Sequence, residues 1–135
     1  MTIRVLLADD HSVLRDGLAA LLAAQDGITV VAHAQDGREA VRKVIEFKPD
    51  VAIMDIVMPE LDGIEAIRRI RTDYPGLRVI AMSGGGQIDK ADFLHMAEAL
   101  GADRVLEKPV RSERLLELVG SVMANPPRRL PERKS

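Results

Sequence analysis

Hydrophobic positions along the chain fall into two alternating patterns. Short and nearly continuous apolar runs predict buried β-strands, and the segments between them carry apolar residues at helical spacing. The predicted strands cover residues 3–8, 29–32, 51–55, 77–82 and 104–106. The predicted helices begin at about residues 12, 36, 62, 89 and 112. Strand and helix alternate five times, which predicts a parallel sheet with five helices distributed over its two faces.

Turn and capping residues mark the ends of these elements. Ser12 is expected to cap the first helix, and Asp62, with a glutamate three residues later, has the spacing of a capping box. Gly101 is the expected stop of the fourth helix. The proline-rich and charged segment 125–135 is predicted to be a disordered tail, so that the folded domain spans residues 1–124.

Composition narrows the class of protein. A chain of 135 residues is long enough for one domain with a proper core. A net charge of -2 argues against non-specific electrostatic binding to nucleic acid. The lack of cysteine excludes disulfides and cysteine-based zinc sites. No apolar run approaches the roughly 18 residues that span a bilayer. We therefore expect a cytoplasmic single domain that binds neither membrane nor nucleic acid directly.

Polar side chains follow four of the five predicted strands. The first strand is followed by Asp9 and Asp10, the third ends in Asp55, the fourth is followed by Ser83 and the fifth leads to Lys108. Ligands of open α/β sheets bind beyond the carboxyl ends of the strands, where the strand order reverses. In the doubly wound, flavodoxin-like order 2-1-3-4-5, the first and third strands would be adjacent at that point, and their three carboxylates would meet.

Three carboxylates in one place repel one another. At about 4 Å and an effective dielectric near 20, each pair costs roughly 4 kcal/mol, which a divalent cation would relieve. Oxygen ligands favour Mg²⁺, with Mn²⁺ as a substitute. A hydroxyl from Ser83 and an ammonium from Lys108 would complete a phosphoryl pocket in which Asp55 is the nucleophile. Taken singly, a helix-capping aspartate, a turn serine and a solvated lysine are the alternatives; their coincidence at four strand ends favours the pocket.

The chain resembles the response regulator receiver domain of two-component phosphorelays over residues 3–123. The resemblance depends on residues that are weak signals singly and specific together: Asp9-Asp10, Asp55 with Met58-Pro59, Asp62-Gly63, Ser83 and Lys108-Pro109. It implies a signalling domain that accepts a phosphoryl group and slowly hydrolyses it, not a turnover enzyme. The donor would be a phosphohistidine on a sensor histidine kinase or a histidine phosphotransfer protein.

The resemblance also assigns roles within the site. It implies that Asp55 is the phosphoryl acceptor and that Asp10 and Asp55 ligate Mg²⁺ directly, together with the carbonyl of Val57. Asp9 would act mainly through water. The peptide bond between Lys108 and the following proline is often cis in this family, which would direct the lysine toward the pocket.

One departure from the family bears on switching. An aromatic residue often stands three positions before the lysine, and this chain has Val105 there, a side chain with no ring to move. We therefore expect switching through the Ser83-Gly84-Gly85-Gly86 loop, unless its glycines are only a loose linker. Phe93 and Met96 are candidates for a partner or homodimer surface, with core packing as the alternative. His11 adjoins the acidic pair, but a surface position without a role is favoured.

The sequence predicts a stand-alone receiver with no output domain, which binds an unidentified downstream protein. A phosphatase with an aspartyl nucleophile is one rival, although Val57 stands where such enzymes usually carry a second aspartate. A flavin-binding protein on the same fold is another, although three aromatic residues leave little to stack on a flavin. A receiver that binds partners without phosphorylation is the third.

Overall fold

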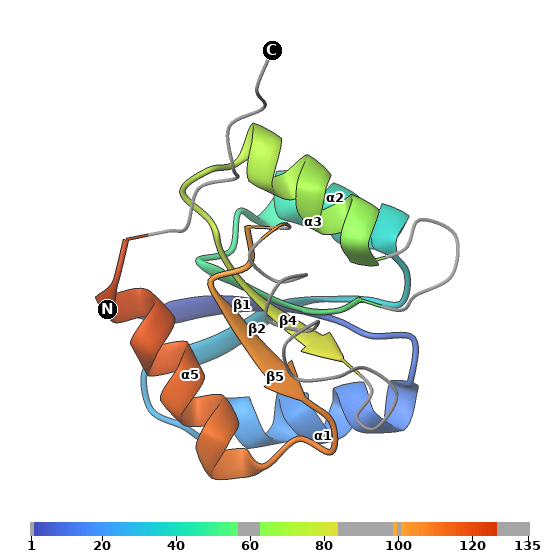
Figure 1. Cartoon of the computed structure of the whole chain (residues 1–135). Coiled ribbons are helices and arrows are strands. Elements are labelled where there is room, and N and C mark those ends of the chain that lie inside the picture. The colour runs from blue at the N-terminus through green and yellow to red at the C-terminus, as the bar shows by residue number, and fades with distance from the viewer. Residues whose placement is uncertain (1, 57–62, 84–98, 100, 127–135) are drawn as a thin grey trace.

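A five-stranded parallel sheet forms the centre of the molecule in the computed structural model, which describes residues 2–56, 63–83, 99 and 101–126 (Figure 1). The strand order β2-β1-β3-β4-β5 confirms the predicted order, and every neighbouring pair is parallel. The strands are β1 (Ile3–Ala8), β2 (Ile28–Ala34), β3 (Val51–Asp55), β4 (Arg78–Ser83) and β5 (Arg104–Glu107). The helices within the described residues are α1 (Ser12–Ala23), α2 (Gly37–Phe47), α3 (Gly63–Asp73) and α5 (Ser112–Ala124).

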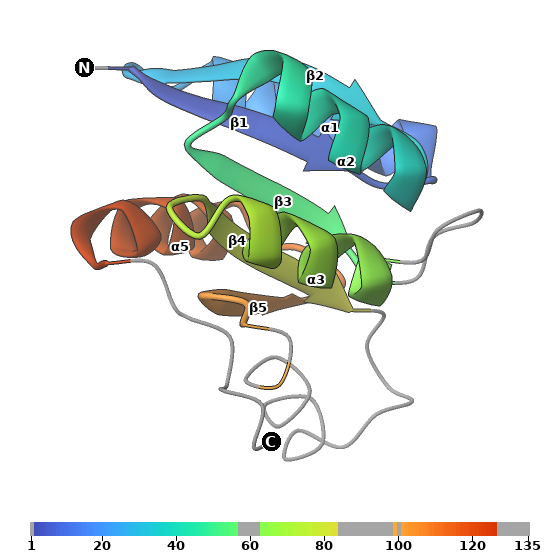
Figure 2. The same ribbon diagram turned by 90° about the horizontal axis from the view of Figure 1, so that it is seen from above.

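Helices cover both faces of this sheet. Figure 2 shows α2 and α3 over one face, and α1 and α5 lie on the other. Successive strand residues point to opposite faces, so the core divides into two clusters. Leu6 and Met54 pack with α2 and α3, whereas Leu7 and Ile53 pack with α1 and α5. Every residue of β3 is buried, which confirms the prediction of a central strand covered on both sides.

The four described helices begin within one residue of their predicted starts, but one predicted cap is wrong. Asp36 caps α2, since its carboxylate accepts a hydrogen bond from the Glu39 N–H at 2.7 Å. The predicted cap at Ser12 is wrong, because Ser12 is the first helical residue and His11 is the N-cap of α1. His11 has extended backbone angles and makes no capping bond with its side chain.

A buried arginine connects α3 to the amino ends of β4 and β5. Arg71 is 2% exposed, and its guanidinium donates to the carbonyls of Gly101 and Leu77 and to the carboxylate of Asp103. The same carboxylate accepts a hydrogen bond from the Val79 N–H at 2.7 Å. This cluster lies at the end of the sheet opposite to the carboxyl ends of the strands.

Several predictions fall on residues outside the described part of the chain. They concern the Val57 carbonyl, the Asp62 cap, the glycine loop, the fourth helix with Phe93 and Met96, and the tail beyond residue 126.

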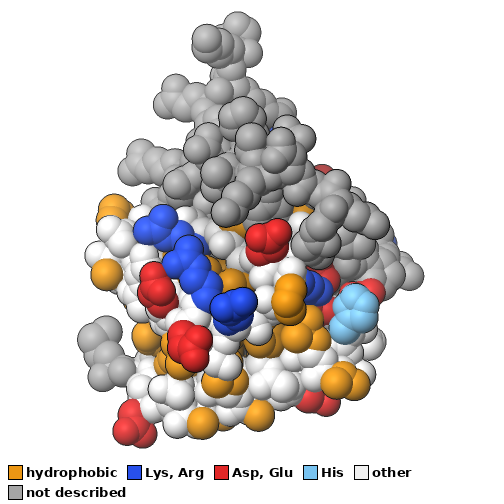
Figure 3. Space-filling model, turned by 60° about the horizontal axis from the view of Figure 1, so that its bottom comes forward, with side chains coloured by type: hydrophobic (Ala, Val, Ile, Leu, Met, Phe, Trp, Pro, Cys, Tyr) orange, Lys and Arg blue, Asp and Glu red, His pale blue; other side chains and the backbone are white. Residues whose placement is uncertain are grey.

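None of the described helices combines the length and apolar character that crossing a membrane requires. Acidic and basic side chains are interspersed on the side of the molecule shown in Figure 3.

Candidate functional site

Asp55 occupies the carboxyl end of the central strand. It is 2% exposed, it pairs in register with Met82 of β4, and the next residue, Ile56, donates its N–H to the Met82 carbonyl at 3.0 Å. The chain returns to this point at Gly63, the first residue of α3. A Cβ on Gly63 would lie 2.0 Å from the Asp55 carbonyl oxygen. The absence of a side chain at Gly63 therefore allows α3 to begin directly against the backbone of Asp55.

Asp9 follows β1 and is held from several sides. Its side chain is 1% exposed, and its N–H donates to the Ala34 carbonyl at 3.0 Å. Its own carbonyl accepts a hydrogen bond from Arg15 Nη1 at 2.7 Å, and its Oδ1 accepts the His11 N–H at 2.8 Å. Asp10, in contrast, is exposed at the rim of the site. The acidic pair thus places one carboxylate inside the fold and one facing solvent.

Lys108 connects the two buried carboxylates. Its Nζ lies 2.8 Å from Asp55 Oδ2 and 3.1 Å from Asp9 Oδ2, and its N–H donates to the carbonyl of Ser83 at 2.8 Å. Burial lowers the pKa of the Lys108 ammonium, but hydrogen bonds and attraction from Asp55 and Asp9 outweigh burial and raise this pKa above its usual value. The ammonium therefore remains charged at neutral pH. The Lys108–Pro109 bond is cis, as the resemblance implied.

Ser83 and Val105 lie on the two strands next to β3 on the side of the sheet that Lys108 completes. Ser83 is 3% exposed at the end of β4, one residue beyond the partner of Asp55 in the ladder. Val105 is half-buried and packs against the core cluster beneath α2 and α3. The structure thus brings together Asp9, Asp55, Ser83 and Lys108, which are distant along the chain.

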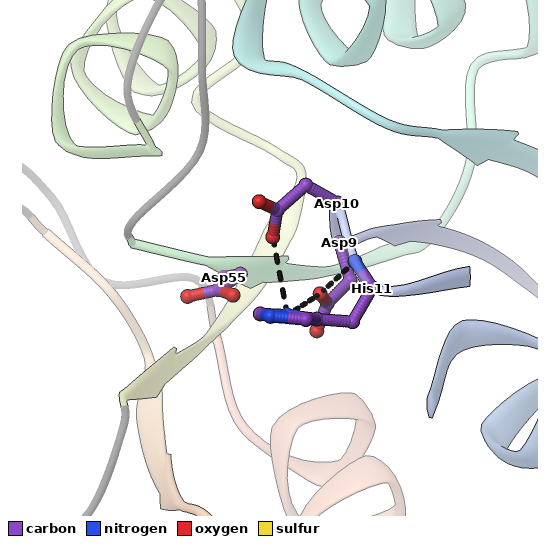
Figure 4. Close-up of side chains that lie close together, drawn as sticks. All are labelled: Asp9, Asp10, His11 and Asp55. Carbon is purple, nitrogen blue, oxygen red and sulfur yellow. Dashed lines mark hydrogen bonds and ion pairs between the residues drawn. The ribbon is translucent and has the colours of Figure 1, made fainter. Parts of the chain in front are cut away.

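Four side chains could hold a metal ion at this edge of the sheet. Asp9, Asp10, His11 and Asp55 each offer a ligand atom, and these atoms lie within 4.8 Å of one another (Figure 4). The three carboxylates carry more negative charge than Lys108 and Arg15 balance, so the donor set fits a divalent ion such as Mg²⁺. The sequence analysis expected oxygen ligands only, including the Val57 carbonyl, and His11 adds a nitrogen atom to the candidate set.

His11 is the member that the sequence analysis set aside. Its Nδ1 lies 3.1 Å from Asp9 Oδ1 and 3.2 Å from Asp10 Oδ1, and the ring is 68% exposed. The available signal was its position directly after the acidic pair, where the chain turns into α1. Gly63 was named only with Asp62, in the capping box and in the family resemblance, because its contact with Asp55 is tertiary.

Comparison with known proteins agrees with this geometry. The family model described as "Response regulator receiver domain" matches residues 5–120. The chain is 43% identical over 81 residues to response regulator GacA of Pseudomonas viridiflava, a match that covers 60% of this chain and 38% of GacA. It is 41% identical over 83 residues to response regulator protein VraR of Staphylococcus aureus, and this match covers 62% of this chain and 40% of VraR. The matches thus span about two-fifths of the length of these relatives.

Solved structures give the same result at the level of the fold. The response regulator domain of Thermotoga maritima CheB superposes with a TM-score of 0.85 at 38% identity, covering 94% of this chain and 100% of that chain. A LuxR-family two-component response regulator from Aurantimonas sp. SI85-9A1 superposes with a TM-score of 0.84 at 31% identity, covering 94% and 89% of the two chains.

Proposed function

Because the chain belongs to the response regulator receiver domain family of two-component signalling, we propose that Asp55 is its phosphoryl acceptor. The observation that carries this proposal is the position of Asp55: a buried carboxylate 2.8 Å from a lysine ammonium and beside the acidic pair. The donor is a phosphohistidine on a sensor histidine kinase or a histidine phosphotransfer protein.

The transfer forms one bond and breaks another. A carboxylate oxygen of Asp55 attacks the phosphorus, the P–N bond of the phosphohistidine breaks, and the leaving imidazole nitrogen takes its electron pair. Lys108, already 2.8 Å from Asp55, pairs with a phosphoryl oxygen, and the Ser83 hydroxyl donates to another. Asp9, Asp10 and Asp55 would hold Mg²⁺, or Mn²⁺ as a substitute, with the Val57 carbonyl as a further ligand, and the ion would supply positive charge against the phosphoryl oxygens.

In the unphosphorylated pocket, the Lys108 ammonium balances negative charge on Asp55 and Asp9, and phosphorylation changes that charge. The phosphoryl group carries close to two negative charges in place of the single charge of the Asp55 carboxylate, a net gain of about one, so the Lys108 contact with Asp9 must be shared with the new oxygens. Val105 offers no ring to follow this change, and the segment of residues 83–86 is the proposed responder. The outcome is altered binding of a downstream protein, with homodimerisation as one form of it.

Intact mass tests the chemistry directly. After exposure to acetyl phosphate and Mg²⁺, the chain should gain the mass of one phosphoryl group, and Asp55→Asn should gain none. Asp26→Asn, which changes an exposed turn aspartate, is the matched control and should be modified like the native chain. Modification of Asp55→Asn, or an unmodified native chain, would exclude the proposal. Sustained hydrolysis of small phosphate esters would instead favour a phosphatase.

A further inference from the structure

The imidazole of His11 faces the acidic pair and not the helix that it caps. It makes no capping hydrogen bond to α1, and its Nδ1 lies between carboxylate oxygens of Asp9 and Asp10. Figure 4 shows the ring lying against these two carboxylates, with Asp55 nearby. We propose that His11 is a direct metal ligand through Nδ1, and that it raises the affinity of the Mg²⁺ pocket for divalent transition ions such as Co²⁺, Ni²⁺ and Zn²⁺.

The spacing of the donor atoms supports this assignment. Adjacent ligands of an octahedral ion with bonds of about 2.1 Å are separated by about 3.0 Å. His11 Nδ1 lies 3.1 Å from Asp9 Oδ1 and 3.2 Å from Asp10 Oδ1. Both separations match adjacent positions around one ion, so the three side chains need little rearrangement to share it.

The environment of the ring suits a ligand. The side chain is 68% exposed, so a hydrated ion reaches it from solvent without opening the core. The backbone on either side is fixed, because the His11 N–H donates to Asp9 Oδ1 and the His11 carbonyl accepts the Arg15 N–H. Without a metal, an Nδ1–H group would donate to the two carboxylates. With the metal in place of that proton, the neutral imidazole would carry its proton on Nε2 and turn the Nδ1 lone pair to the ion.

The donor set determines the preference among ions. Carboxylates alone suit Mg²⁺, whereas imidazole suits Zn²⁺, Ni²⁺ and other later first-row ions. Losing an imidazole should therefore weaken Ni²⁺ binding much more than Mg²⁺ binding. This inference deepens the proposed function, since it concerns the same pocket, but metal binding is measured without any phosphoryl transfer.

The test compares Ni²⁺ and Mg²⁺ affinities by calorimetry for the full chain, His11→Ala and His33→Ala. His33 is the matched control, an exposed histidine on β2 that is not a member of the cluster. We expect His11→Ala to weaken Ni²⁺ binding by about tenfold or more and Mg²⁺ binding by less than about twofold, and His33→Ala to change neither. In the Co²⁺-loaded protein, a paramagnetically shifted imidazole proton should disappear only in His11→Ala.

Two results would overturn the inference. Equal losses for Ni²⁺ and Mg²⁺ in His11→Ala would mean that the histidine only positions Asp9 and Asp10. Unchanged Ni²⁺ affinity would mean that the ring is not a ligand. Either result is compatible with normal phosphorylation of Asp55, whereas an unmodified native chain with intact Ni²⁺ selectivity would remove the proposed function and leave this inference standing.

Discussion

Gly63→Ala is the most direct test of how the fold positions Asp55. The added methyl carbon would lie 2.0 Å from the Asp55 carbonyl oxygen and 2.5 Å from the Ile56 Cα. Since non-bonded carbon contacts are comfortable at roughly 3.5 Å, α3 and the end of β3 must separate by about 1–1.5 Å. The atoms in the way belong to the backbone, so no rotamer change can relieve the contact.

That displacement has two measurable consequences. Overpacking of this kind typically costs about 1–3 kcal/mol of unfolding free energy. A misplacement of about 1 Å at a reacting group can lower a rate by about 100-fold. We therefore expect Gly63→Ala to fold with reduced stability and to accept the phosphoryl group on Asp55 much more slowly than the native chain.

Urea denaturation followed by circular dichroism measures the first effect, and the initial rate of mass gain in acetyl phosphate measures the second. Gly120→Ala is the control, because no atom lies within 4 Å of its added Cβ and the residue lies within α5. Better helix propensity should make this control equal to the native chain or more stable, by up to about 1 kcal/mol. If Gly63→Ala matched the native chain in both measurements, the contact with Asp55 would have no positioning role.

Three further changes test the electrostatics and the capping. Because the folded pKa of Lys108 is raised, its contribution to stability is fully present below the pKa of an unfolded lysine and is lost as pH rises through the folded value. Unfolding free energy measured at increasingly alkaline pH should therefore fall less steeply in Lys108→Met, and parallel curves would contradict this. Arg71→Met should cost about 3–5 kcal/mol in urea denaturation, because the buried Asp103 carboxylate loses its cation. Adding Asp103→Asn should cost less than the sum of the single changes; strict additivity would argue against coupling. Asp36→Ala should cost about 1 kcal/mol through loss of the Glu39 N–H bond, and an unchanged urea midpoint would refute a capping role.

The hydrophobic pattern of the sequence was sufficient to predict the order of the strands and helices, but not the residues at which they end. β3 is a continuous apolar run, and all of it is buried in the sheet. β2 continues to Ala34, beyond its predicted end, because Ala8 of β1 pairs with Ala34. The length of the edge strand β2 is set by how many of its residues pair with β1. Which strand lies next to β2 depends on the topology of the whole sheet. The predicted topology came from a general rule for open α/β sheets and from no residue in β2 itself.

Some residues of the candidate site could likewise be predicted from the sequence, and others could not. Asp9, Asp55 and Lys108 could be grouped from sequence because parallel strands bring their carboxyl ends to one edge. His11 could not, since its role depends on a side-chain orientation that residue spacing does not specify. The Arg71 cluster was also missed, because a lone arginine on a helix is usually solvated, and its partners come from two other segments, those that precede β4 and β5.

The two ends of β5 are secured by different chemistry. This edge strand has only four residues; Arg71 fixes the chain just before it through Gly101 and Asp103, and Lys108 fixes the chain just after it through Asp55 and Ser83. A sliding strand would reverse which side chains face the core, but the amino-terminal attachment does not involve the phosphoryl pocket. Two independent attachments, only one of which belongs to the phosphoryl pocket, therefore hold β5 in register against β4, so a change in the Lys108 contacts leaves the amino-terminal attachment in place.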